Sequence, residues 1–191
     1  AIIINMVDPE TAAQCVEAAG DVPVVFVNRF PGDPSVLNEK AVYVGSDEMT
    51  SGAFQGEFLA KFFKDQGKTD ISYLMLNGIL GQTSTTNRTA SVLKALEDNG
   101  IKATAAAAPL AADYDRATAM DMISPLLKTT KYDCIISNND AMALGALQAI
   151  EAAGRKVNED IYLVGVDALT EAVQNVIDGK QTGTVFNNHF A

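Results

Sequence analysis

Residues Tyr132–Ala172 decide the fold of this chain, and they read YDCIISNNDAMALGALQAIEAAGRKVNEDIYLVGVDALTEA. Residues 133–137 form a short apolar run that stops at a polar segment, and residues 141–153 carry apolar side chains at helical spacing. A second apolar run, Ile161–Val166, stops at Asp167. The pattern predicts strand, helix, strand, with polar side chains at the carboxyl end of each strand, the edge where open parallel sheets bind ligands.

The rest of the chain repeats this alternation with short connections. We predict further strands at Ala1–Asn5, Val22–Val27, Ala41–Gly45, Ile71–Leu76, Lys102–Pro109 and Thr182–Phe186. We predict further helices at Asp8–Ala19, Glu48–Asp65, Arg88–Asn99 and Asp115–Leu127, with a polar loop at Asn77–Thr86. Repeated βα units with buried strands indicate the α/β class, a doubly wound parallel sheet with helices on both faces. In the helix from residue 48, we expect Phe54, Phe58, Leu59 and Phe62 to lie on one apolar face.

Composition and charge limit the classes of partner. The chain has 191 residues, of which 48% are hydrophobic, and its net charge of −10 argues against a nucleic-acid surface, which needs clustered Lys and Arg. No apolar run approaches the ~20 residues of a membrane span. The chain opens in the apolar run Ala1–Ile4 without an initiator Met, so we expect a processed or cut fragment.

Catalytic chemistry finds little support in the sequence. There is no Gly-x-Gly-x-x-Gly segment and no phosphate loop, and the one histidine, His189, is expected to be a solvated tail residue. Asp140 and Asp167 could form an acid/base pair. With no histidine or metal-ligating cluster near them, we interpret Asp140 as a helix N-cap and Asp167 as a ligand acceptor. We therefore predict no enzyme, no catalytic residue, no cofactor and no metal.

Amides, carboxylates, a guanidinium and an aromatic ring follow the predicted strands. They are Asn5, Asn28, Arg29, Asp47, Asn77, Tyr114, Asn139, Asp167 and Asn187. Amides donate and accept, carboxylates accept hydroxyl protons, and an aromatic face covers the C–H side of a sugar ring. Each Asn or Asp taken alone is equally typical of a cap or turn. The set together predicts a cleft for a neutral polyhydroxylated ligand.

Six short segments carry a resemblance to one family. They are Asn5–Pro9, Val22–Asn28, Val44–Asp47 with Gly52 and Gln55–Gly56, Asn138–Ala143, Gly165–Leu169 and Gly183–Asn187. In this order, and over essentially the whole chain, they resemble type I periplasmic sugar-binding proteins, closest to the glucose/galactose-binding branch.

The resemblance implies a set of ligand contacts. It implies sugar contacts from Asn5, Arg88, Asn139, Asp167 and Asn187, and ring stacking from Tyr114. Gln82 and Ser84 stand where that branch has a histidine and an aspartate. The missing carboxylate leaves glucose or galactose specificity open, and Asn28-Arg29 resembles the ribose-binding branch. The segment before residue 71 is too short for that branch's calcium loop, so we predict no calcium.

The resemblance also implies a lobe organisation and a role. Residues 1–43 correspond to a remnant of the amino-terminal lobe, residues 44–184 to a nearly complete carboxy-terminal lobe, and residues 185–191 to a hinge strand returning to the first lobe. The expected function is extracytoplasmic binding of a monosaccharide, glucose/galactose-like, for ABC-type import and, in some members, chemotaxis. The expected partners are the sugar, a membrane permease and a chemoreceptor, and the expected location is periplasmic or extracellular and lipid-anchored. A partial lobe also predicts an apolar patch and self-association.

An alternative from another class shares the same fold. The effector-binding core of a LacI-type transcription regulator has a similar Asn-Asp-x-x-Ala-x-Gly-Ala segment. The segments Gly165–Leu169 and Asn5–Pro9 favour the transport branch instead.

Overall fold

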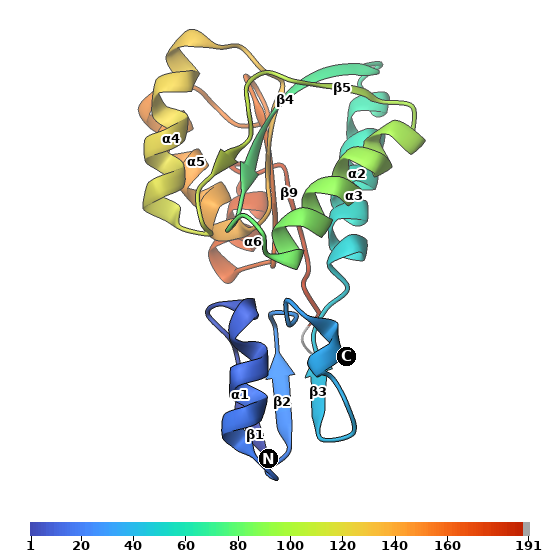
Figure 1. Cartoon of the computed structure of the whole chain (residues 1–191). Helices are drawn as coiled ribbons and strands as arrows, with labels where there is room; N and C mark the ends of the chain where they lie inside the picture. Colours follow the sequence, from blue (N-terminus) through green and yellow to red (C-terminus); the bar gives the residue numbers. More distant parts are fainter. Residues whose placement is uncertain (189–191) are drawn as a thin grey trace.

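The computed structural model describes residues 1–188 and contains two α/β bodies, one beneath the other in Figure 1. The expectations for His189 and for the end of the 185–191 strand lie outside these described residues. Every strand pairing between the named strands of residues 1–188 is parallel, so the predicted α/β class is confirmed. None of the helices in this range is both long and apolar enough to cross a membrane.

The smaller body is a three-stranded sheet with one helix on one face. Its elements are β1 (Ile2–Ile4), α1 (Ala12–Ala19), β2 (Val24–Val27) and β3 (Ala41–Val44), with 3-10 turns at Pro9–Thr11 and Pro34–Val36. Met6, Ala12 and Phe26 are buried at the centre of the helix-covered face. On the other face, Ile3, Val25 and Val42 share one row of the sheet, and Ile3 and Val42 are exposed. The second turn lies in the connection between β2 and β3.

The larger body is a six-stranded sheet covered by helices on both faces. Its strands are β4 (Asp70–Asn77), β5 (Lys102–Ala105), β6 (Leu110–Ala111), β7 (Cys134–Ser137), β8 (Tyr162–Val166) and β9 (Gly183–Val185). Its helices are α2 (Glu48–Asp65), α3 (Thr83–Asp98), α4 (Arg116–Thr129), α5 (Asp140–Ala152) and α6 (Thr170–Ile177). The strand order is β5-β4-β7-β8-β9, and β6 pairs with the end of β4.

Alternation along the strands divides the core of this body in two. Ile71, Tyr73 and Met75 of β4 pack with α2 and α3, whereas Leu74 and Leu76 pack with α4 and α5. Successive side chains of a strand point to opposite faces, so a strand with helices on both sides is apolar throughout. This is why the central strands read as continuous apolar runs in the sequence.

The apolar face predicted for α2 is buried only in part. Leu59 is buried and Phe62 packs against the core, but Phe54 and Phe58 are exposed, while Gly56 and Phe63 face the interior. Two glycines, Gly52 and Gly56, form the contact with α3, because a Cβ at Gly56 would lie 2.5 Å from the Val92 carbonyl oxygen. Close approach of two helix backbones needs small residues, so packing selects the glycine side of α2 over the aromatic one.

Gly56→Ala is therefore expected to destabilise the larger body although alanine favours helix. The new methyl group overlaps the α3 backbone, and overpacking typically costs about 1–3 kcal/mol. We expect a net loss of about 2 kcal/mol in the free energy of unfolding, measured by urea denaturation. Glu57→Ala, on the exposed side of the same helix, should change it by less than about 0.5 kcal/mol. Equal stability of the two variants would contradict this packing.

Two boundaries also differ from the predicted ones. Helix α3 begins at Thr83, inside the predicted loop 77–86, and β5 ends at Ala105, with β6 as a separate short strand before α4. Serine and threonine are poor helix formers, so local propensity indicated loop. In the structure Thr85 is buried and its hydroxyl lies 2.8 Å from the Tyr114 hydroxyl, so tertiary contacts extend the helix.

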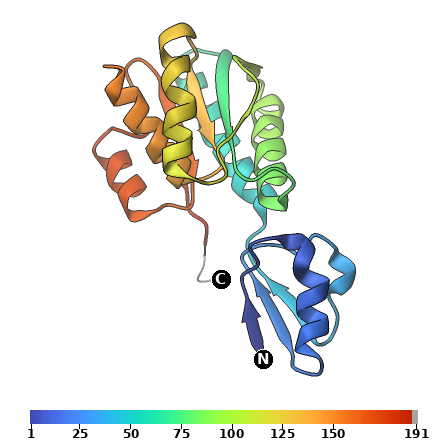
Figure 2. The same ribbon diagram turned by 60° about the vertical axis from the view of Figure 1, so that its left-hand side comes forward.

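Two connecting segments join the bodies. The first runs from the end of β3 to the start of α2, and the second follows β9 toward the smaller body (Figure 2). The Ser46 hydroxyl donates a hydrogen bond to Asn187 Oδ1, which ties the two segments together.

Candidate functional site

A cavity of about 190 Å³ lies between the two bodies, at the carboxyl ends of their strands. Asn28 and Arg29 reach it from the end of β2 in the smaller body, and the other lining residues belong to the larger body or to the segments that connect the two. The lining residues are Asn28, Arg29, Glu48, Gln82, Ser84, Arg88, Tyr114, Asn139, Asp167 and Asn187. The strand-end edge is the expected binding position of open parallel sheets.

The structure brings seven of the eight predicted ligand residues to this cavity. They are Gln82, Ser84, Arg88, Tyr114, Asn139, Asp167 and Asn187. Asn5 is not among the lining residues; it is exposed, and its Oδ1 accepts a 3.4 Å hydrogen bond from Asn28 Nδ2. Asn5 therefore lies behind a lining residue. The ligand role of each residue stays a prediction.

Arg88 is the central charge of the site. Its side chain is buried on α3, and Nε lies 2.5 Å from Glu48 Oε2 at the start of α2. Nη1 donates to the Asn138 carbonyl oxygen at 2.7 Å and lies 3.6 Å from Asp167 Oδ1. Burial acts to lower the pKa of Arg88, but the hydrogen bond and charge of Glu48, with the charge of Asp167, outweigh it and hold the pKa above its ordinary value. The guanidinium is thus fixed in place and always charged.

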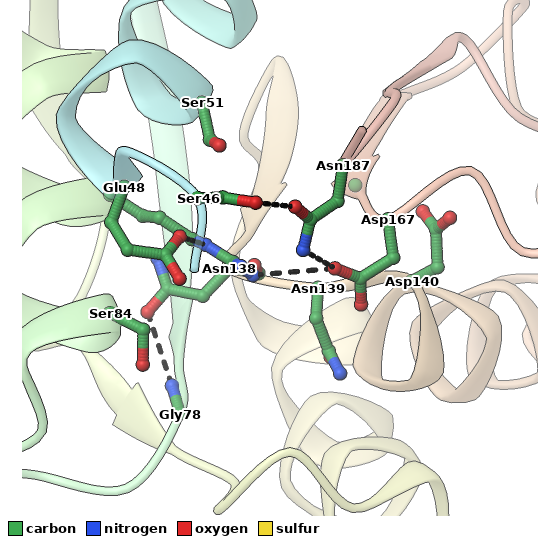
Figure 3. Close-up of polar contacts among 12 residues, drawn as sticks. Ser46, Glu48, Ser51, Gly78, Ser84, Asn138, Asn139, Asp140, Asp167 and Asn187 are labelled. Atoms are coloured by element: carbon green, nitrogen blue, oxygen red, sulfur yellow. Dashed lines mark hydrogen bonds and ion pairs between the residues drawn. The ribbon is translucent and has the colours of Figure 1, made fainter. Parts of the chain in front are cut away.

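Asp167 stands at the end of β8 and faces Asn187 (Figure 3). Asn187 Nδ2 donates to Asp167 Oδ1 at 3.4 Å. Burial raises the pKa of Asp167, and the Arg88 charge and the Asn187 hydrogen bond oppose this shift only in part. A carboxylate held in this way is a strong acceptor for a ligand hydroxyl.

Three lining residues have left-handed backbone conformations. The φ angles are 67° at Asn28, 63° at Tyr114 and 116° at Asp167. Residues other than glycine rarely adopt such angles, and a structure keeps them where the surrounding contacts over-determine the backbone, often at ligand sites. Their gathering around one cavity supports a pre-organised binding site.

Tyr114 forms one wall of the cavity. Its ring lies over Gly78, where a Cβ would come within 2.0 Å of the ring, and its hydroxyl contacts Ser84 Oγ at 2.7 Å and Thr85 Oγ1 at 2.8 Å. The hydroxyl of Ser84, which was predicted to bind the ligand, is therefore already hydrogen-bonded to the protein. These contacts fix the ring plane, as an aromatic face for a sugar ring requires.

The predicted cap of α5 is wrong. Asn139, not Asp140, is the N-cap residue, and its Oδ1 accepts from Met142 N at 3.0 Å. Asp140 is fully buried and accepts hydrogen bonds from Leu169 N and from the Thr184 hydroxyl, both at 2.9 Å or less. Since the cap uses the oxygen of Asn139, its Nδ2 is the group available to a ligand.

Sequence reasoning missed Glu48 and Asn138. Glu48 follows the helix cap Asp47, where an acidic residue is favoured by the helix dipole alone, so nothing local marks it as a lining residue. Asn138 is buried and accepts from Gly78 N at 3.1 Å (Figure 3). It also donates to Thr89 Oγ1 at 3.1 Å. Its hydrogen bonds connect the segment after β7 to the segment after β4 and to α3.

The chemistry of the site suits binding of a neutral polar ligand. Two guanidinium groups, Arg29 and Arg88, balance two carboxylates, Glu48 and Asp167, and the remaining lining groups are amides, hydroxyls and an aromatic ring. In the described part of the chain, no three His, Cys, Asp or Glu side chains gather in a way that could hold a metal ion. Among residues 1–188, the cavity lining contains neither cysteine nor histidine to serve as a nucleophile or its base.

Comparison with known proteins gives one family over the whole chain. A family model described as Periplasmic binding protein domain matches residues 1–191. The chain is 37% identical to the D-galactose/methyl-galactoside binding periplasmic protein of Haemophilus influenzae, over 98% of this chain and 59% of that protein. It is 30% identical to a putative rhizopine-binding protein of Rhizobium meliloti, over 98% of this chain and 60% of that protein.

One solved structure of a solute-binding protein is also similar to this chain. An ABC transporter solute binding protein from Bacillus halodurans, with bound myo-inositol, superimposes with a TM-score of 0.81 at 29% identity, over 95% of this chain and 60% of that one. The chain thus spans about 60% of the length of the relatives that it matches.

Proposed function

The chain belongs to the periplasmic binding protein domain family, as its resemblance predicted, and from this premise we propose that it binds a neutral monosaccharide as the larger part of an extracytoplasmic solute-binding protein. One observation carries the proposal, namely the cavity in which balanced charges, amides and an aromatic wall meet between two bodies. The relatives named above are solute-binding proteins, and no catalytic role is proposed.

The proposal also specifies the sugar, the partner proteins and the location of the protein. We propose a glucose/galactose-like sugar, delivery to an ABC-type permease with a chemoreceptor as a further partner, and a periplasmic or lipid-anchored extracellular location. The relative named for D-galactose binding supports this ligand class, while the myo-inositol complex keeps other polyols open. Residues 1–43 and 44–184 would be parts of the two lobes, with 185–191 as a hinge strand. Self-association through the open face of the β1–β3 sheet stays a prediction.

The proposed mechanism is a two-state hinge. Asn28 and Arg29 contact the ligand from the smaller body, and Arg88, Asp167 and Tyr114 contact it from the larger one. A ligand that contacts both bodies when they are closed, but only one when they are open, shifts the population toward the closed form by its differential affinity. The closed form would then be the one that a permease binds.

Calorimetric titration with glucose, galactose, ribose and xylose tests this function. We expect saturable binding of at least one sugar, and we expect Asp167→Asn to weaken it about tenfold or more, since a charged acceptor is lost. Asparagine tolerates the positive φ at this position, so the backbone should stay in place. Asn139→Ala should also weaken binding, with about 1 kcal/mol of lost helix capping as a side effect.

Asp121→Asn is the matched control for that titration. Asp121 is exposed on α4 and does not line the cavity, so its replacement should leave sugar binding unchanged. A folded chain that binds none of the four sugars at millimolar concentration would contradict the proposed function of this chain.

The core of a LacI-type regulator remains the alternative, since it shares this fold. Sequence upstream of the chain separates the two classes, because a secretion signal would indicate the transport protein and a helix-turn-helix segment the regulator.

A further inference from the structure

We propose that Glu48 determines ligand specificity by accepting a hydrogen bond from a sugar hydroxyl, which gives the site a second carboxylate beside Asp167. The inference rests on the proposed sugar-binding function and names the chemistry of the ligand more closely. It would also supply a carboxylate to a site in which Ser84 stands where the resembled branch has an aspartate.

The position of Glu48 leaves one of its oxygens for a ligand. Glu48 is the first residue of α2, its side chain is 10% exposed, and it lines the cavity. Oε2 is bound to Arg88 Nε, and the contacts among residues 1–188 include none for Oε1. Arg88 Nη2 likewise has no partner among them. Glu48 Oε1 and Arg88 Nη2 are therefore an acceptor and a donor that a ligand in the cavity could use. Figure 3 shows Glu48 in the site.

Gln82 adds a second unpartnered acceptor on the same side. It is 5% exposed, and its Oε1 has no hydrogen-bond partner among the described residues. Glu48 and Gln82 line this cavity together, and they also line the narrow gap beside it against Pro9 and Phe30. A buried acceptor without a donor, such as Gln82 Oε1, costs free energy, and Glu48 Oε1 is a further acceptor beside the same cavity, so the two together indicate that the ligand brings the donors.

These acceptors define the class of ligand. A vicinal diol would match these two groups. One hydroxyl would accept from Arg88 Nη2, and the neighbouring hydroxyl would donate to Glu48 Oε1. A sugar acid would place its carboxylate against Glu48 and Asp167 and be repelled. Because the two arginines and two carboxylates of the lining cancel, no net charge favours an ionic ligand. The site therefore selects a neutral sugar with adjacent free hydroxyls.

Deoxy sugars measured against Glu48→Gln test the proposal directly. The parent sugar is whichever of glucose, galactose, ribose and xylose binds the wild-type chain most tightly. For one monodeoxy derivative, we expect the wild-type chain to lose about tenfold or more in affinity, because a hydrogen bond to a carboxylate is lost. In Glu48→Gln the penalty for that same derivative should fall to about threefold or less, while the penalties for the other derivatives stay unchanged. Glu57→Gln, an exposed glutamate on the same helix, should behave as wild type.

The outcomes separate the roles that Glu48 could have. A purely structural role would weaken binding of every sugar by one factor and leave all deoxy penalties unchanged, and this result would overturn the proposal while the sugar-binding function stands. Absence of any wild-type titration would overturn the sugar-binding function instead, and this inference with it. If Glu48→Gln loses its circular dichroism signal, Glu48→Asp is used, because it keeps the charge but withdraws the carboxylate by one methylene.

Discussion

Arg88→Met is expected to abolish measurable sugar binding, with a loss of affinity of at least about 100-fold. Arg88 lies between Glu48 and Asp167, and it donates to the carbonyl oxygen of Asn138, in the segment that follows β7. Methionine fills a similar volume but brings no donor, so the buried Glu48 carboxylate loses its ion-pair partner and Asp167 loses the positive charge beside it, although Asn187 still donates to Asp167. Titration with the sugar that the wild-type chain binds measures the loss.

The same substitution should also destabilise the chain. Removing one partner of a buried ion pair costs about 3–5 kcal/mol, because an uncompensated charge is left behind. If this is the cause, the double variant Arg88→Met with Glu48→Gln should recover part of the free energy of unfolding and none of the binding. Lys94→Met, which removes an exposed cation from the same helix, is the control and should change stability by less than about 1 kcal/mol. Sugar binding retained in Arg88→Met would contradict the central role of Arg88.

The sequence predicted the order of strands and helices because that information is local. Each central strand is a short apolar run between polar segments, and each run ends in a residue such as Asp167 or Asn139. Parallel strands put their carboxyl ends at one edge, so residues far apart in the chain could be expected to meet there. Six of the nine predicted strand-end residues line the cavity, whereas Asn5, Asp47 and Asn77 are not among its lining residues.

The errors arose where tertiary contacts outweigh local preference. Phe54 and Phe58 of α2 are exposed, yet Gly52 and Gly56 are buried because α3 must approach closely. Glu48 and Asp140 were both read as ordinary residues of a helix start. Whether such a carboxylate is exposed, caps a helix or is buried depends on the neighbouring segments, which a local pattern does not contain.

Asp140 gives the chain a pH-dependent stability. Burial raises the pKa of Asp140 to about 6, although hydrogen bonds from Thr184, Leu169 and Gln181 oppose the shift. The unfolded chain ionises this group near its ordinary pKa of 3.8, so the folded chain holds the proton more tightly. The stabilising contribution is therefore complete below about pH 4 and is lost as the pH rises through about 6. The loss is on the order of 3 kcal/mol, since each pKa unit corresponds to about 1.4 kcal/mol.

Asp140→Asn isolates this contribution because asparagine has a similar shape and does not titrate. We expect the free energy of unfolding of the wild-type chain, relative to Asp140→Asn, to fall by about 3 kcal/mol between pH 4 and pH 7, measured by urea denaturation at each pH. Asp121→Asn should show no comparable trend. A difference between wild type and Asp140→Asn that is constant with pH would contradict the prediction.

Asp140 accepts hydrogen bonds from the backbone of Leu169 and from the hydroxyl of Thr184. Leu169 lies two residues from Asp167, and Thr184 lies three residues from Asn187. The ionised carboxylate accepts these hydrogen bonds more strongly than the neutral acid does, so we expect the loss of stability to come from the burial of its charge and not from the loss of these contacts.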